Sequence, residues 1–372
     1  MSHSIFNNLN WNKIFYSFVV PIIILLLILS TIGLLFVYST TNDNERTFDK
    51  QQKWFFLSIV VFFITMRINY KWLLEYSFIF YILGVVVLAL LFAVDPFVGS
   101  TRRWIRISQY SIQPSEFMKY ALVLVLAKLF SQFVKNKDKT HFDIIPAFLI
   151  TCVPASLVFL QPDLGTSLVF FGTLFVMSFV VGIPIRHIIL LSLLAFSLIY
   201  SYGLKPYQKK RLTNFFQPLI HQELPRHLEE GEMYQLIQSL NAYGSGGWFG
   251  SGLKKGYQNT NNFLPAKKTD FIFAIIGEEW GFAGTFFVIV LYFALFSFLL
   301  FTASSLPDLQ AQLIVVGITA ILAIQTFINI FMTVGLAPIT GIPLPFISYG
   351  GSSLISSFLG IGIVVSLQVS EQ

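Results

Sequence analysis

The chain of 372 residues is 55% hydrophobic, contains 41 phenylalanines and has only 11% charged residues, less than half the charged fraction of an average soluble domain. These proportions exclude an ordinary soluble fold and indicate a membrane protein. The apolar runs are continuous rather than alternating, so they predict spanning helices and exclude a transmembrane barrel. A net charge of +6 fits basic loops at an anionic membrane better than nucleic-acid binding. The single cysteine, Cys152, excludes an intrachain disulfide.

Long apolar segments follow one another along the whole chain. The first, from Ile14 to Tyr38, exceeds the roughly 7–15 apolar residues of a cleaved signal peptide, which predicts a retained first span. Because a helical span needs about 20 apolar residues, we expect an all-α bundle of ten spans that forms one membrane domain over residues 1–372. The spans are expected at 14–38, 53–66 with its flanks, 72–94, 114–134, 144–160, 165–183, 186–204, 270–303, 310–335 and 348–369.

Two of the connecting segments are distinctive. The segment 95–113 combines Arg102, Arg103 and Arg106 with neighbouring apolar residues, which predicts an amphipathic helix in the membrane interface. The segment 205–269 is the largest polar stretch and is expected to form a large loop outside the membrane. Lysine and arginine residues divide almost equally between the two sides of the predicted topology, so they do not fix its orientation.

Ionisable residues inside spans are costly and therefore mark candidate functional sites. Ser115, Glu116 and Lys119 open the fourth span, where the acidic residue suits the helix N-terminus and can pair with the lysine three positions later. This pattern fits a capped helix start as well as a substrate site. Lys128 lies deeper among apolar residues, where it either forms an ion pair in the bundle or extends to the far interface.

Two aspartates stand at the ends of expected spans on the same side of the membrane. Asp163 occupies a tight connection and could cap the helix that follows, whereas Asp270 follows the large polar segment and precedes an apolar run. Glu278 and Glu279 lie about 12 Å further along the same helix. Since adjacent helical residues point in different directions, at least one of these glutamates should face the bundle, as carboxylates on an ion path would.

A dense proline- and glycine-rich motif precedes the last span. Such a backbone is broken, and it persists at membrane depth only where protein or a water-filled cavity satisfies it; the simpler interpretation is a sharp loop between helices. The key motif residues are Pro343, Pro345, Ser348, Gly350, Gly351 and Ser352.

Several motifs together resemble the RodA/FtsW/SpoVE family, also called SEDS proteins. They are GSTRRWI (99–105), QPSEFMK (113–119), QPDLGTS (161–167), GSGGWFGSGL (244–253), LPAKKTDFIFAIIGEEWGF (264–282), and the region that begins at Asn329 and ends with PITGIPLPFISYGGSS (338–353). They occur in the order and at the spacing of that family, and the resemblance covers nearly the whole chain.

The resemblance implies a multi-pass protein of the bacterial cytoplasmic, or inner, membrane with ten spans and both termini in the cytoplasm. It places Asp163, Asp270 and the loop 205–269 on the outer face. It also implies a peptidoglycan glycosyltransferase that polymerises lipid II and releases undecaprenyl pyrophosphate. Asp270 matches the family's essential aspartate and is the expected general base. Lys268 stands where the family usually has histidine.

The implied reaction makes further demands on the chain. The leaving pyrophosphate needs positive charge, which could come from Lys119, from the arginines of 95–113 such as Arg103, or from a divalent cation (Mg²⁺ or Mn²⁺) on Asp163 or Asp270. Other candidate substrate-binding residues are Ser115, Glu116, Lys128 and Asp163. Grooves between spans should hold the polyprenyl tails.

Alternatives to this function also follow from the sequence. A lipid II flippase would use intramembrane charges in a similar way, and a scaffold for a periplasmic synthase would tolerate changes at the aspartates. Within the family, NNFLP (261–265) and the motif 338–353 are more similar to the elongation enzyme, RodA, than to the division enzyme, FtsW. The family works with a class B penicillin-binding protein, a transpeptidase, which is therefore the expected partner.

Overall fold

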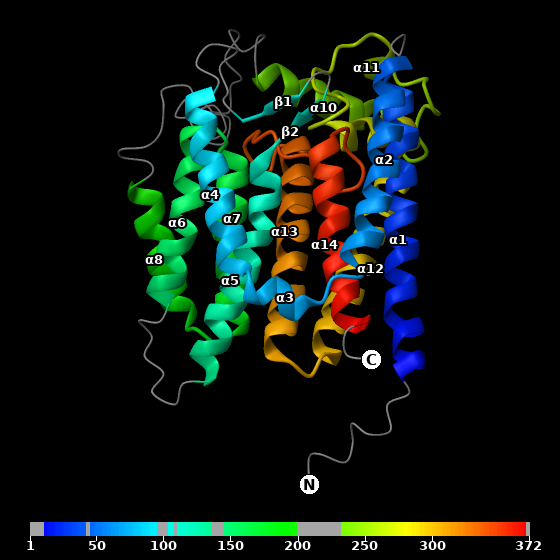
Figure 1. Cartoon of the computed structure of the whole chain (residues 1–372). Helices are drawn as coiled ribbons and strands as arrows, with labels where there is room; N and C mark the ends of the chain where they lie inside the picture. The colour runs from blue at the N-terminus through cyan, green and yellow to red at the C-terminus, as the bar shows by residue number, and fades with distance from the viewer. Residues whose placement is uncertain are drawn as a thin grey trace.

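The computed structural model describes residues 11–41, 45–94, 103–107, 110–135, 144–198 and 232–369, most of which are helical (Figure 1). The N-terminal half contains α1 (Trp11–Thr40), α2 (Glu45–Thr65), α3 (Tyr70–Glu75), α4 (Ser77–Val94), α5 (Pro114–Lys135), α6 (Ile144–Leu160), α7 (Leu164–Val180) and α8 (Ile185–Leu198). The C-terminal half contains α10 (Glu232–Gly246), α11 (Tyr257–Thr260), α12 (Ile272–Ser305), α13 (Leu309–Thr333) and α14 (Gly351–Val369).

The helices confirm a predominantly α-helical membrane protein. Five of the described helices, α1, α5, α12, α13 and α14, are long and apolar enough to cross a membrane, and α4, α6 and α7 are shorter apolar helices. Each of the ten expected spans overlaps a helix, including α2 and α8. That all ten cross the membrane remains a prediction.

The longest helices run side by side in one bundle. Helix α13 lies at its centre and packs against α5, α7, α12 and α14. Large apolar side chains point outward from the bundle, for example Phe63, Leu193 and Phe293, which suits a surface covered by lipid. Helix α1 begins and α14 ends at the same end, as an even number of spans requires (Figure 1).

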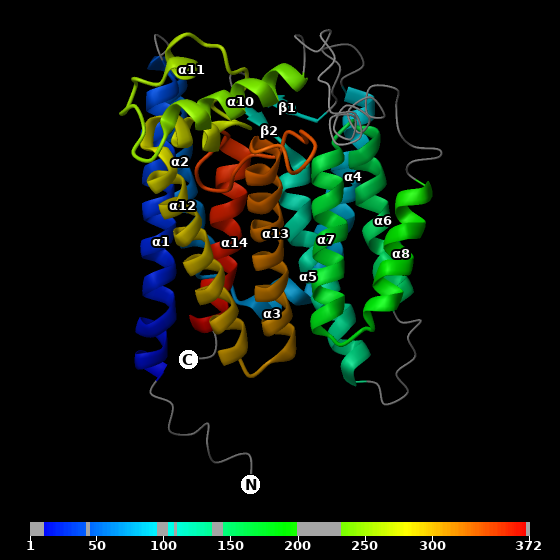
Figure 2. The same ribbon diagram turned by 180° about the vertical axis from the view of Figure 1, so that it is seen from behind.

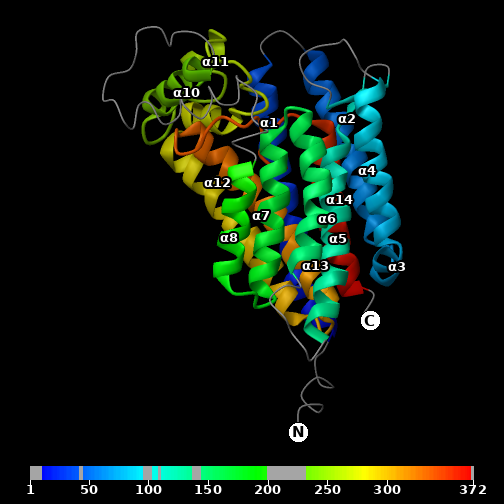
Figure 3. The same ribbon diagram turned by 90° about the vertical axis from the view of Figure 1, so that its left-hand side faces the viewer.

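The opposite end carries β1, β2, α10 and α11, and we call it the α10 end. Helix α10 lies across this end and packs on α12 (Figure 2). Seen from the side, α10 and α11 lie over α12, away from α3 and α4 (Figure 3). The described part of the expected large loop, residues 232–269, is therefore folded onto the bundle.

The segment 95–113 does not form the expected amphipathic helix in its described part. Residues 105–107 (β1, Ile105–Ile107) pair antiparallel with β2 (Tyr110–Ile112), and Ile105 lies opposite Ile112. Arg106 is exposed between two isoleucines, an alternation with the period of a strand rather than of a helix. Residues 95–102, 108 and 109 lie outside the described residues.

Helix α12 is broken at Gly281, whose φ of 67° and ψ of −164° are not helical. The carbonyl groups left without helical partners before the break are capped by the glycine-rich segment 244–253. Ser251 N donates to Glu278 O and Gly252 N donates to Glu279 O, both at 3.0 Å.

The same segment also begins the second part of α12. Phe282 N donates to Gly247 O at 2.9 Å, and Ala283 N donates to Trp248 O at 3.0 Å. The glycine-rich segment therefore replaces the hydrogen bonds that the helix loses at its break, which a bilayer could not supply.

Glycine is required here because two backbones approach each other closely. A Cβ on Gly246 would lie 2.0 Å from Gly277 O, and a Cβ on Gly250 would lie 2.2 Å from Glu279 O. Both distances are far below any normal contact, so a side chain at either position must displace backbone atoms.

We predict that Gly246→Ala lowers the melting temperature of the detergent-solubilised protein, because overpacking of this kind costs about 1–3 kcal/mol. Gly244→Ala is the matched control in the same helix, since a Cβ at Gly244 meets nothing within 4 Å and alanine favours the helix. Thermal unfolding followed by tryptophan fluorescence compares the two. Equal melting temperatures would contradict the close approach.

Candidate active site

Asp270 lies in the turn that leads into α12, and its backbone is fixed by the centre of the bundle. Asn329 of α13 is fully buried, and its Nδ2 donates to Asp270 O at 2.9 Å and to Ile342 O at 2.8 Å. One side chain thus joins the turn before α12 to the irregular loop between α13 and α14. The carboxylate lies beside Gly341, where a Cβ would be 3.7 Å from Asp270 Oδ2.

The motif before the last helix holds the residues directly before Asp270. Ser348 Oγ donates to Thr269 O at 2.6 Å, and Tyr349 N donates to Lys268 O at 2.9 Å. Three consecutive carbonyl groups, from 268 to 270, therefore accept hydrogen bonds from Tyr349, Ser348 and Asn329. The position of Asp270 is consequently fixed from outside its own segment.

The motif is a buried, irregular loop, as a broken backbone at membrane depth requires. Pro343 and Pro345 remove two backbone donors that would need partners, and Tyr292 Oη donates to Pro345 O. Gln51 of α2 accepts from Gly350 N at 3.2 Å and donates to Ser348 O at 3.4 Å.

The end of the motif packs against other helices. A Cβ on Gly351 would lie 2.3 Å from the Trp54 ring, so glycine is needed there. Ser352 Oγ accepts from Gln113 N at 3.0 Å and donates to Ser111 O at 3.3 Å. These contacts join the motif to α2 and to the strand that precedes α5.

Asp163 caps α7, as one of its two interpretations predicted. Its Oδ1 accepts from Thr166 N at 3.1 Å, and its Oδ2 accepts from Gln113 Nε2 at 3.0 Å. The Arg103 guanidinium lies 3.8 Å from Oδ2, and Arg103 Nε donates to Gln161 O at 3.0 Å. Asp163 therefore has several partners, and Arg103 is anchored beside it.

The two aspartates lie at the same end of the bundle, as the count of spans predicted. Gly165, two residues after Asp163, is in close contact with Thr340 and Ile342, and the intervening Gly341 approaches Asp270. The loop 340–342 thus touches the surroundings of both carboxylates.

Glu116 and Lys119 form the ion pair that their spacing predicted. Lys119 Nζ lies 2.9 Å from Glu116 Oε2, and Ser356 Oγ of α14 donates to the same oxygen at 3.1 Å. Both side chains are buried, and so is Ser115 in the first turn of α5. The two charges neutralise each other inside the bundle. The hydrogen bond from Ser356 also joins α5 to α14.

Lys128 does not join this group. Its Nζ donates to Leu74 O at 3.3 Å and to Glu75 O at 3.5 Å, at the C-terminus of α3. Helix α3 lies at the end of the bundle away from α10 (Figure 1), so Lys128 reaches the far interface rather than an ion pair. The carbonyl end of a helix favours a cation there.

Both glutamates of α12 are fully buried. Glu278 accepts from Gln258 N at 2.6 Å and from Asn259 N at 3.1 Å. Glu279 accepts from Ser39 Oγ of α1 at 2.6 Å and from Asn259 Nδ2 at 2.6 Å. The two carboxylates hold α11 and the end of α1 against α12.

The sequence interpretation missed residues that connect these glutamates to the aspartate. Lys267 Nζ donates to Asn259 Oδ1 at 2.8 Å and to Asn259 O, so the segment before Asp270 is also tied to the glutamate network. Lys267 lies inside the LPAKKTD motif, but only its contact with a residue eight positions earlier reveals its role.

The candidate ligands of a divalent cation are the carboxylates of Asp163 and Asp270. No cluster of three or more histidine, cysteine, aspartate or glutamate side chains occurs within the described ranges. Asp163 does not fit a metal, because N–H donors and the Arg103 guanidinium occupy both of its oxygens. Asp270 alone fits the way Mg²⁺ is usually held, by one or two carboxylates with substrate phosphates and water.

A helical membrane bundle with a buried proline- and glycine-rich loop bonded to an acidic turn defines the class of this protein. Residues 19–372 match the family model described as a cell cycle protein, the FtsW/RodA/SpoVE model. The chain therefore belongs to the FtsW/RodA/SpoVE, or SEDS, family.

Relatives from three branches of the family are similar over nearly their whole length. Stage V sporulation protein E of Bacillus subtilis is 38% identical over 93% of this chain and 95% of its own. A probable peptidoglycan glycosyltransferase FtsW of Coxiella burnetii is 33% identical over 96% of this chain and 97% of its own. The peptidoglycan glycosyltransferase RodA of Treponema pallidum is 29% identical over 94% of this chain and 97% of its own.

Solved structures show the same fold. A chain from a structure described as coordination of polymerization and crosslinking by a peptidoglycan synthase complex matches with a TM-score of 0.79 at 28% identity, covering 94% of this chain and 96% of that one. The rod shape determining protein RodA of Thermus thermophilus matches with a TM-score of 0.70 at 26% identity, covering 94% and 95%.

The buried Lys267 makes stability depend on pH. Burial lowers the pKa of its ammonium from 10.5 to about 8, and the neighbouring Lys268 acts in the same direction, whereas Glu279 and Glu278 act against it. Between about pH 8 and 10.5 the unfolded chain keeps a proton that the folded chain has released. The free energy of unfolding therefore rises with pH across this window, by at most about 1.4 kcal/mol per pH unit.

We predict that Lys267→Met removes this rise, whereas Lys255→Met, at an exposed position of the same outer segment, keeps it. Melting temperatures measured from pH 7.5 to 10 for both variants and the parent chain test the assignment. Parallel pH profiles for Lys267→Met and the parent would contradict it.

Proposed function

We propose that this protein is a peptidoglycan glycosyltransferase that polymerises lipid II, with Asp270 as the general base. The observation that carries the proposal is the support of Asp270. Hydrogen bonds from Asn329, Ser348 and Tyr349 fix three consecutive carbonyl groups at that point. A base must be held in a fixed position relative to the hydroxyl that it deprotonates.

In the proposed reaction, the acceptor sugar's 4-hydroxyl oxygen attacks the anomeric carbon of the donor. Asp270 takes the hydroxyl proton, the new glycosidic bond forms, and the bond to the phosphate oxygen breaks. The electron pair leaves on undecaprenyl pyrophosphate. A divalent cation held by Asp270 and the phosphates would neutralise part of this charge.

The cations expected from the sequence have other partners. Lys119 is 1% exposed and paired with Glu116, and Arg103 lies between Gln161 and Asp163. Of the two, Arg103 is the better candidate for contact with a substrate phosphate, because its side chain is 20% exposed.

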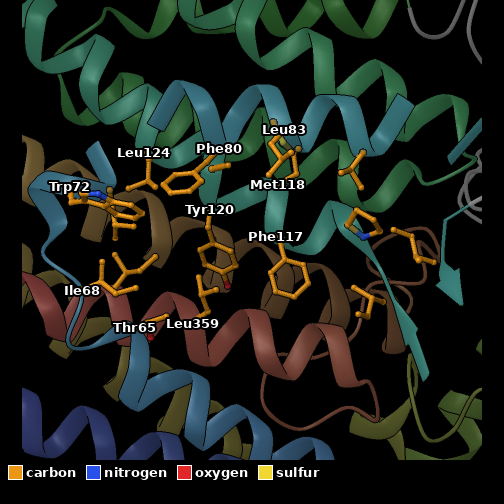
Figure 4. A pocket seen from close by; sticks show the side chains of 18 residues that line it. Thr65, Ile68, Trp72, Phe80, Leu83, Phe117, Met118, Tyr120, Leu124 and Leu359 are labelled. Carbon is orange, nitrogen blue, oxygen red and sulfur yellow. The ribbon is translucent and has the colours of Figure 1, made fainter. Parts of the chain in front are cut away.

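A groove between α2, α3, α4, α5 and α14 suits a polyprenyl tail. It has a volume of about 550 Å³ and an almost wholly apolar lining. Figure 4 shows Trp72 toward one end of the groove and Phe117 nearer the β-strands, with Phe80 and Tyr120 between them. The lining runs from α3 to the strands of the α10 end, so a tail in the groove would place its headgroup at that end.

We also propose that the enzyme acts in cell elongation, because 261–265 and 338–353 are more similar to RodA than to FtsW. We further propose that the partner is a class B penicillin-binding protein, as the resemblance to the family implies. The polymerising and crosslinking complex that matches in fold supports such a partner. The proposed location is the bacterial inner membrane with both termini in the cytoplasm and the α10 end outside.

Asp270→Asn should reduce glycan polymer formation from lipid II by about 10²-fold or more, the usual contribution of a general base. The assay uses detergent-solubilised protein, since a flippase or a bare scaffold forms no polymer there. Asp308→Asn is the control, because Asp308 precedes α13 at the end away from α10. Normal polymer from folded Asp270→Asn protein would overturn the assignment.

The groove can be tested with a photocrosslinking residue at Leu83, which lines it. The control is Ile82 of the same helix, which is 58% exposed against 60% for Leu83 but does not line the groove. We expect labelled undecaprenyl phosphate to crosslink at Leu83 in preference to Ile82, and labelled phosphatidylethanolamine to show no such preference. Equal crosslinking of the polyprenyl probe at both positions would exclude the groove.

A further inference from the structure

A second cavity lies at the α10 end, beside Asp270. It has a volume of about 520 Å³ and is bounded by Thr47 of α2, Asn262, residues 264–269 and Tyr349 of the motif. Its lining differs from that of the apolar groove in containing hydroxyl, amide and ammonium groups. Thr269 belongs to its wall and is the immediate neighbour of Asp270.

The charged side chains that line this cavity are Lys267 and Lys268. The Lys267 ammonium donates to Asn259, which does not line the cavity, so Lys267 contributes the aliphatic part of its side chain to the wall. Among the described residues, no hydrogen bond or ion pair engages the half-buried Lys268 ammonium. Lys268 is therefore the cation that a bound anion would meet.

The walls of the cavity are preformed. The hydrogen bond from Tyr349 N to Lys268 O holds these two residues against each other. Ala266 has a φ of 53°, a left-handed conformation that costs energy for alanine and is common at functional sites, whereas Asn262, with a φ of 57°, adopts it more readily. The segment thus keeps a strained shape around a basic cavity.

The distance to Asp270 identifies which phosphate fits. Consecutive Cα atoms are about 3.8 Å apart, so the Cα atoms of Lys268 and Asp270 lie within about 8 Å of each other. In the proposed reaction, the donor diphosphate is bonded to the carbon under attack, whereas the acceptor diphosphate lies two sugars away from the attacking hydroxyl. Because the Lys268 and Asp270 side chains leave the backbone within this span, a cavity lined by Lys268 suits the diphosphate of the donor better than that of the acceptor.

We propose that this cavity binds the diphosphate of the donor substrate, with Lys268 as its cation and Tyr349 as a neighbouring hydroxyl donor. This inference rests on the proposed function and specifies the part of the site that stabilises the leaving group. As the bond between the anomeric carbon and phosphate breaks, the added negative charge on the diphosphate develops beside the Lys268 ammonium.

Binding of undecaprenyl pyrophosphate, inorganic pyrophosphate and undecaprenol to the detergent-solubilised full chain tests the proposal. Lys268→Glu should weaken binding of both diphosphates by about tenfold or more, because a charged hydrogen bond is replaced by repulsion. Binding of undecaprenol should not change. Lys255→Glu makes the same charge change on the same outer segment, outside the cavity, and should leave all three affinities unaltered.

Other outcomes would overturn the proposal. They are unchanged diphosphate affinity in Lys268→Glu, an equal loss in Lys255→Glu, and equal competition by phosphatidylglycerol, which would indicate a general lipid phosphate site. Lys268→Gln gives the same comparison if the glutamate variant does not fold. Binding is measured without turnover, so the two proposals can fail separately. If the parent chain polymerises lipid II and Lys268→Glu still binds both diphosphates normally, only this inference is refuted. A parent chain that forms no polymer refutes the proposed function.

Discussion

Buried backbone groups at membrane depth must find partners within the protein, and this constraint determines how the α10 end is built. The loop between α13 and α14 is irregular, yet residues 342–348 are almost all buried. Its own groups and those of the turn before α12 satisfy each other through Ser348, Tyr349 and Asn329. The bonds that stabilise the loop are therefore the same bonds that position Asp270.

The same constraint accounts for the glycine-rich segment. A break at Gly281 leaves carbonyl groups before it and N–H groups after it without helical partners, and residues 247–252 supply both sets. Only glycine permits two backbones to approach so closely. The part of α12 before the break carries Glu278 and Glu279, which bind residues of α11, and Asn259 of α11 in turn accepts from Lys267 in the segment before Asp270.

The helices could be predicted from the sequence because each apolar run is long enough to be recognised by itself. The break in α12 could not, since 270–303 is mostly apolar, contains no proline, and Gly281 resembles any other helical glycine. The β-strands were mistaken for a helix because the arginines and tryptophan suggested an interfacial segment, and the alternation at Ile105–Ile107 is only three residues long.

In the candidate site, Asp163 and Asp270 could be found because carboxylates are rare among apolar runs. Their supports could not, because Gln51 contacts a residue almost 300 positions away and Asn259 contacts Ser39 over 220 positions. Polar residues such as these become informative only when the fold brings their partners together. The sequence therefore points to the reactive group better than to the groups that hold it.

The charged residues of the bundle and of its α10 end differ in whether the protein itself balances them. Glu116 and Lys119 balance each other, and Lys128 binds the carbonyl end of α3. In the described part of the chain, Lys268 has no such internal partner, which leaves its charge for a ligand. An anion that enters the cavity lined by Lys268 would therefore meet a cation that no other described side chain pairs with.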